Sequence, residues 1–389
     1  AILLVFALFS LYSGFLLHRL QQWFPAGITY GDMAREVVGP TGQKIVFAFI
    51  YVAFFGNLAI YILTCAESLQ NVFYDHPTWC KWPFTLVTCF FLLPFCQLRT
   101  LHHVSYVASA SAAAIIVALV IVLAVAFTDD REIAPLTDLP AAVGAAEQLS
   151  PLVHFFKTMS AVTTAIFAFG GQGLYFETMA EMRKPEQFPR AVTLTTGLIL
   201  VIYIVVALAC FSVYGTSVRG NILFALPDQF PKRVAAALLF FHVCISYVLA
   251  QQVIGRAIHV RVSHDVVDSG TWREKRQWLA ISSALLVLSF LIANGIPFFS
   301  SLMGFVGALS TAPLTFGIPA FLVYKASTFL PPLPGRQKRI ATYEYGALVT
   351  FGVLTVFLTL VGCASNISEL VRNWGDVGAP FACHAGHHN

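Results

Sequence analysis

Charge is scarce in this sequence. Asp, Glu, Lys and Arg make up 11% of its 389 residues, whereas hydrophobic residues make up 58%. Because a soluble globular protein carries roughly 25% charged residues, this shortage excludes an ordinary water-soluble fold. No polar stretch between the apolar runs is long enough to form a domain of its own.

Motifs for several enzyme classes are also missing. The sequence holds no Walker loop, no zinc-protease helix and no convincing Ser-His-Asp arrangement, so neither an ATP-driven pump nor an intramembrane protease is supported. Its eight cysteines lack metal-ligand spacing, and most lie in apolar runs, where cysteine behaves as a small apolar residue. We therefore expect no metal, no cofactor and no enzymatic activity.

Long apolar runs are what the sequence has instead. Ten of them can cross a bilayer, and each is continuously apolar rather than alternating, which favours helices over a β-barrel. The chain is thus predicted to be an all-α polytopic membrane protein. The predicted spans are 1–17, 45–70, 82–97, 104–127, 153–179, 188–213, 232–256, 277–293, 297–323 and 342–364.

Lysine and arginine are divided unevenly between alternate loops. One set of loops holds 16 of the 23 basic residues and the other holds 7. Since cytosolic loops carry the excess of basic residues, the richer set is predicted to be cytosolic and both chain ends non-cytosolic. The net charge of +4 is therefore no sign of nucleic-acid binding. Ala1 lies inside an apolar run without a signal peptide, so we expect one further helix upstream and eleven in all.

A glycine-rich break interrupts the span 153–179. Gly170-Gly171-Gln172-Gly173 places three glycines in four positions, and each disfavours a helix by roughly 1 kcal/mol relative to alanine. Non-helical backbone survives in a membrane only where it lines a cavity, and broken helices supply such backbone to substrates and ions. The alternative is a kinked helix packed through small residues. The break favours a transporter.

Several stretches resemble the amino acid/auxin permease family. FAFGGQGLYFETMAEMRKPEQFPRA (167–191) is similar to its sixth transmembrane segment, and GIPFFSSLMGFVGALSTAPLTFGIPAFLVY (295–324) to its ninth-to-tenth segment signature. TYGDMAREVVGPTGQ (29–43) and LTCAESLQNVF (63–73) extend the resemblance over nearly the whole chain. It implies a 5+5 inverted-repeat (leucine-transporter-like) fold whose first segment, with the amides expected to hold a substrate carboxylate, is absent here.

The resemblance also implies a division of the single transporter domain, 1–389. Residues 1–127 would form the first repeat without its first helix, and residues 153–324 the second repeat. An eleventh helix, 342–364, and a non-cytosolic tail, 365–389, would follow.

The predicted substrate site centres on the break. Its first candidates are the backbone groups of Phe169, Gly170, Gly171, Gln172 and Gly173, because unwound carbonyls accept hydrogen bonds from an ammonium group. Polar side chains on other spans are placed across the cavity: Asn57, His242, Ser246, Ser310 and Thr311. The alternatives are a packed histidine and hydrogen bonds that only join helices.

Carboxylates within the bilayer are costly and therefore indicate function. Glu177, about one turn past the break, is predicted to carry the coupled proton or to switch a gate; the alternative is that it only braces the broken helix through backbone hydrogen bonds. Glu67 and Glu181 are placed nearer cytosolic helix ends, either solvated or paired with Arg183 and Lys184. Sodium sites of the resembled fold use paired hydroxyls on segment eight, where this chain has Ser246 alone, so protons are favoured over Na⁺.

The sequence therefore predicts a secondary active amino acid transporter, proton-coupled and working by alternating access, in the plasma membrane or a vacuolar or vesicular membrane. An auxin or aromatic-acid carrier and a non-transporting amino acid sensor are the alternatives.

Two covalent modifications are also considered. Asn366 begins a glycosylation sequon that is either occupied or too close to the membrane. Cys80 and Cys383 either form a disulfide or remain free. The expected partners of the protein are an amino acid and the lipid bilayer, and the sequence leaves its oligomeric state open.

Overall fold

The computed structural model describes residues 2–73, 80–98, 104–128, 150–215, 220–267, 269–296, 299–328 and 342–377. All regular secondary structure within these ranges is helical. Nine helices among the described residues are long and apolar enough to cross a membrane. The chain is therefore an all-helical, multi-pass membrane protein.

The spanning helices overlap nine of the predicted runs, and α14 continues past residue 364 to Val377, into the segment 365–389 that was predicted to be a tail. They are α1 (Ile2–Trp23), α3 (Pro40–Val72), α5 (Val104–Thr128), α7 (Pro151–Ala168) with α8 (Tyr175–Glu181), α9 (Phe188–Tyr214), α10 (Phe230–Val262), α11 (Trp272–Gly295), α12 (Phe299–Val306) with α13 (Ile318–Thr328), and α14 (Thr342–Val377).

The remaining predicted span, 82–97, which is third in chain order, is shorter than the other predicted spans. It corresponds to α4 (Lys81–Phe95), an apolar helix of 15 residues. At a rise of 1.5 Å per residue such a helix covers only about 22 Å, less than the ~30 Å of a hydrocarbon core. The described residues thus hold nine candidate spans and one shorter apolar helix, and not ten full spans.

A short helix outside the spans is α2 (Tyr30–Val38). Thr29 caps its first turn in a reciprocal arrangement, since the Thr29 side chain accepts from the Asp32 backbone and Asp32 bonds back to Thr29. The helix ends at Gly39, whose φ of 96° is readily adopted only by glycine. Local sequence therefore fixes both ends of α2.

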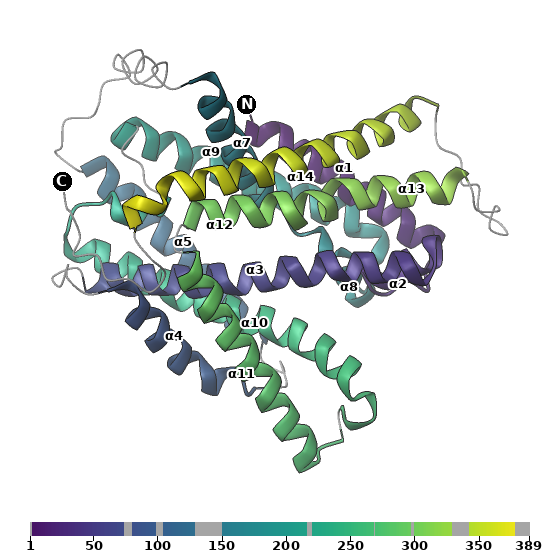
Figure 1. The fold of residues 1–389 in the computed structure, drawn as a ribbon, viewed down its shortest axis with the longest axis horizontal. Coiled ribbons are helices and arrows are strands. Elements are labelled where there is room, and N and C mark those ends of the chain that lie inside the picture. The colour runs from purple at the N-terminus through teal and green to yellow at the C-terminus, as the bar shows by residue number, and fades with distance from the viewer. Residues whose placement is uncertain are drawn as a thin grey trace. The chain divides into compact units, whose positions relative to one another are not determined.

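The described chain falls into two compact units. The first unit comprises Ala1–Ala53, Leu149–Val205 and Met303–Leu370. Within it α1 packs against α7, α8 and α13, and α2 packs against α8 and α13 (Figure 1). Aromatic rings of α1 meet Phe351 of α14, with centroids 5.0 Å from Phe9 and 5.4 Å from Tyr12.

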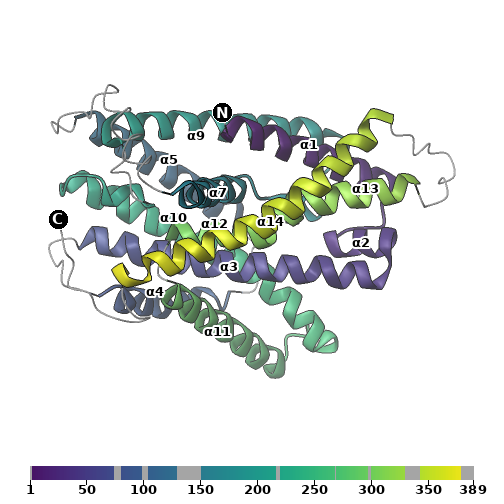
Figure 2. The same ribbon diagram turned by 45° about the horizontal axis from the view of Figure 1, so that its top comes forward.

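The second unit comprises Phe54–Gln148, Val206–Leu302 and Val371–Asn389. Within it α10 packs along α5, and α11 packs beside α4, as both ribbon views show (Figures 1 and 2). Each unit thus joins elements from both halves of the chain. The predicted boundaries of the repeats follow sequence order and stay a prediction.

Candidate functional site

The helix of 153–179 is interrupted at the predicted position. α7 ends at Ala168, a single 3₁₀ turn, η2 (Gln172–Leu174), follows the glycines, and α8 starts at Tyr175. Gly170 and Gly171 are exposed, whereas the Gln172 side chain is 1% exposed. The break therefore presents glycine backbone on one side and buries a carboxamide on the other.

Two π-helical turns lie against this break within the first unit. They are η7 (Gly307–Thr311) and η8 (Pro313–Gly317), and such turns are frequent at functional sites. A Cβ atom on Gly170 would overlap with the methyl group of Thr311, so only glycine lets the break pack this closely against that side chain. Two predicted site residues, Gly170 and Thr311, are thereby brought together.

Ser310 lies in the same π-helical turn. Its hydroxyl donates to the Val306 carbonyl at 2.9 Å and is fully buried, while the Thr311 hydroxyl reaches the same carbonyl at 3.4 Å. Both hydroxyls thus bond to their own helix. A role in substrate binding for Ser310 and Thr311 stays a prediction.

The Gln172 carboxamide is the most connected group at the break. Its Nε2 donates to Ser10 Oγ at 2.7 Å, and its Oε1 accepts from Gly171 N–H at 2.8 Å and from Thr315 Oγ1 at 3.0 Å. Ser10 Oγ donates onward to the Phe169 carbonyl at 3.2 Å. Ser10 and Thr315 were not predicted, because a hydroxyl in an apolar run carries no signal of its partner.

Glu177 lies two residues into α8 and is partly buried. Its carboxylate interacts with its own backbone N–H and with that of Tyr30, the first residue of α2, and it lies near the negative charge of Asp32. Its Oε2 atom is buried and has no hydrogen-bond partner among the described residues. The group combines a favourable backbone dipole with one unsatisfied oxygen.

Tyr30 connects three parts of the first unit. Its ring packs on Phe176 with centroids 5.3 Å apart, and its hydroxyl donates to the Leu314 carbonyl of η8 at 2.9 Å. Burial raises the pKa of Tyr30 well above its ordinary value, so the hydroxyl remains a donor at physiological pH. The start of α2 is thus tied to α8 and to η8.

The remaining predicted cavity residues belong to the second unit. His242 Nδ1 lies 2.8 Å from Ser111 Oγ and 3.0 Å from the Ser111 carbonyl oxygen, and Ser246 donates to the His242 carbonyl at 3.0 Å. Asn57 is partly buried in α3. His242 therefore bonds to a neighbouring helix, and the contribution of these three residues to a substrate cavity stays a prediction.

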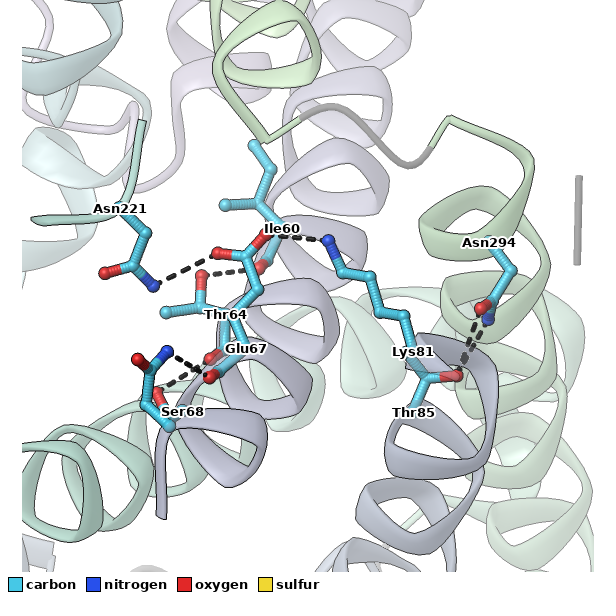
Figure 3. Close-up of polar contacts among 9 residues, drawn as sticks. Ile60, Thr64, Glu67, Ser68, Lys81, Thr85, Asn221 and Asn294 are labelled. Carbon is cyan, nitrogen blue, oxygen red and sulfur yellow. Dashed lines mark hydrogen bonds and ion pairs between the residues drawn. The ribbon is translucent and has the colours of Figure 1, made fainter. Parts of the chain in front are cut away.

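The surroundings of Glu67 differ from those predicted from the sequence. It is 4% exposed, and its two carboxylate oxygens accept from Lys81 Nζ at 2.7 Å and from Asn221 Nδ2 at 3.1 Å (Figure 3). The prediction of a solvated group or a pair with Arg183 or Lys184 is wrong, because α4 and the loop before α10 bring other partners. Lys81 also belongs to a loop that the charge count places opposite the cytosol.

The structure bears on two predicted covalent modifications, glycosylation of Asn366 and a disulfide of Cys80. Asn366 is 2% exposed in α14, where its amide donates to Thr163 at 3.0 Å and its carbonyl accepts from Ser160 at 2.9 Å. A glycan on Asn366 would require these contacts to break. Cys80 is disulfide-bonded. Its predicted partner, Cys383, lies outside the described residues.

Comparison with known proteins gives a consistent result. A family model described as transmembrane amino acid transporter protein matches residues 1–367. Amino acid transporter AVT1B of Arabidopsis thaliana is 23% identical over 383 residues, covering 95% of this chain and 65% of the relative. Vacuolar amino acid transporter 4 of Saccharomyces cerevisiae is 25% identical over 384 residues, covering 91% and 52% respectively. The chain thus spans between half and two thirds of these relatives.

Proposed function

We propose, from the premise that this chain belongs to the transmembrane amino acid transporter family, that it moves amino acids across a membrane through a site at the α7–α8 break. Family membership makes it a transporter and not an enzyme. The observation that supports this position of the substrate site is the exposed backbone of Gly170 and Gly171 beside η7. Such backbone offers acceptors to a substrate ammonium group and admits close approach.

We assign the coupling step to Glu177. An ionised carboxylate is favoured beside the first N–H groups of α2, because these carry the positive end of the helix dipole. A proton on Glu177 would remove this attraction and supply the unsatisfied Oε2 with a hydrogen. Protonation would thereby loosen the contact between α8 and α2, which is the change that a gate requires.

The repeat architecture is part of this proposal. Counted with a missing first helix, α4 and α11 are the fourth segments of the two predicted repeats, and they pack together within the second unit. That pairing supports a 5+5 inverted repeat that works by alternating access. The names of the related amino acid transporters favour amino acids over indole acids as substrates, and the name of the yeast relative favours a vacuolar membrane.

Uptake into proteoliposomes tests the proposal. Proteoliposomes that contain the purified protein should accumulate at least one amino acid when a pH gradient is imposed. A sodium gradient alone should drive no accumulation. Absence of accumulation under both gradients would refute transport. Accumulation driven by sodium alone would refute the assignment of protons.

A further inference from the structure

Gln172 has a buried side chain whose hydrogen-bonding capacity is almost fully used. A carboxamide offers two donor hydrogens and two acceptor lone pairs. Oε1 accepts from Gly171 N–H and Thr315 Oγ1, and Nε2 donates to Ser10 Oγ, with the Ser10 carbonyl a further 3.5 Å contact. Asparagine would be one methylene too short, and an apolar side chain would remove the bonds to Gly171 N–H, Thr315 Oγ1 and Ser10 Oγ.

These bonds form a closed path around the break. Ser10 Oγ receives the Gln172 amide and donates to the Phe169 carbonyl, so the residues on both sides of the two exposed glycines are held by one hydroxyl. The Gly171 N–H is turned toward Gln172 Oε1. The conformation of Gly170-Gly171 is therefore set from behind, by a group that does not share their exposure.

The same carboxamide joins the break to α1 and η8. Ser10 belongs to α1, and Thr315 belongs to η8. Ser13 of α1 also donates to the Thr315 carbonyl, so α1 and η8 are tied to each other as well as to Gln172. All of these contacts lie within the first unit.

We infer that Gln172 is a positioning residue that holds the glycine break in its substrate-binding shape and links that shape to α1 and η8. It acts through Gly171 and Phe169, and its side chain does not touch the substrate. Losing the bonds would spread the break over several conformations. Apparent affinity falls in proportion to the fraction in the competent shape, whereas the rate of the loaded transporter need not change.

Gln172→Met tests this role, because methionine keeps the length of the side chain and removes its hydrogen bonds. The KM for the amino acid should rise roughly tenfold or more, with the maximal rate per folded protein within about twofold of wild type. Gln187→Met is the matched control, since Gln187 is exposed in the same unit. It should leave both kinetic constants unchanged.

A double-mutant cycle with Thr315→Val separates positioning from general destabilisation. Thr315→Val alone should raise KM roughly threefold, and it should add little in the Gln172→Met background, where its hydrogen bond is already absent. Additive effects would contradict the inference. Thr315→Val also serves as the test if Gln172→Met does not reach the membrane, and a wild-type KM would then overturn the role.

Hydrogen exchange gives a readout that is independent of transport, since only the kinetic test rests on the proposed function. Gln172→Met should accelerate amide exchange in residues 169–174, and Gln187→Met should not. If wild type transports nothing, the proposed function fails while this readout still decides the role of Gln172. Unchanged exchange together with unchanged KM, or a loss of affinity with unchanged exchange, would overturn the inference.

Discussion

Two carboxylates in transmembrane helices show opposite ways of placing a charge in this protein. Glu67 of α3 has a lysine on one oxygen and an asparagine amide on the other. Glu177 of α8 has the backbone N–H of Tyr30 and a buried oxygen without a partner among the described residues.

The difference concerns what each group can do. The carboxylate of Glu67 has a hydrogen-bond partner on each oxygen, so it joins α3, α4 and the loop at Asn221 (Figure 3). Glu177 keeps one buried oxygen without such a partner among the described residues, which leaves that oxygen available to bind a proton. We therefore treat Glu67 as a structural group and Glu177 as the coupling group.

The largest effect on stability is expected at Glu67. Glu67→Gln removes the charge that Lys81 faces, and breaking a buried ion pair costs about 3–5 kcal/mol. Because the Lys81 side chain is 26% exposed, we expect the lower end of this range. Thermal unfolding in detergent measures it, with Glu181→Gln as a control at an exposed position. Equal melting temperatures for the two variants would contradict the structural role of Glu67.

A smaller effect, measured in transport, is expected at the glycine break. Gly170→Ala adds a methyl group that overlaps with Thr311, at a typical overpacking cost of about 1–3 kcal/mol. Uptake should fall roughly tenfold. Gly197→Ala is the matched control, because Gly197 is exposed in α9, away from the break, and a Cβ there meets nothing within 4 Å.

Removing the methyl group that causes this overlap gives a further check. Thr311→Ser lacks the methyl group, so it should restore uptake to Gly170→Ala. If Gly170→Ala transports at the wild-type rate, or if Thr311→Ser fails to restore it, close approach at the break is not what the glycine provides.

The smallest effect is expected at Tyr30. Tyr30→Phe keeps the ring contact with Phe176 and removes the bond to the Leu314 carbonyl, at a cost of about 1 kcal/mol. Because burial raises the pKa of Tyr30 well above its ordinary value, this cost should be equal at pH 6 and pH 8. Thermal unfolding at both pH values measures it, and Tyr106→Phe, at a residue 79% exposed, should change nothing. A wild-type melting temperature for Tyr30→Phe would remove this contact from the list of stabilising bonds.

The sequence predicted the spans and the break because both depend on local composition. Long apolar runs identify membrane helices, and the glycines at 170, 171 and 173 disrupt one of them wherever it packs. The run 82–97 was counted as a span although it is short, and α4 (Lys81–Phe95), with 15 residues, matches it closely in length.

Local sequence patterns could not predict which side chains contact each other in the folded protein. Asn221 lies 154 residues from Glu67, and Thr315 lies 143 residues from Gln172. No periodicity in the sequence relates such positions. The burial of Glu67 and the hydrogen bonds of Gln172 therefore became visible only when the helices were packed.

Proton coupling in Glu177→Gln tests the contrast between the two carboxylates most directly. Glutamine keeps the size and the hydrogen bonding of the side chain but cannot titrate. In proteoliposomes the variant should lose accumulation driven by a pH gradient, while counterflow exchange of the amino acid, which needs no net proton movement, should continue. Accumulation at the wild-type level, in protein that is normally inserted, would contradict the assignment of Glu177 as the proton carrier.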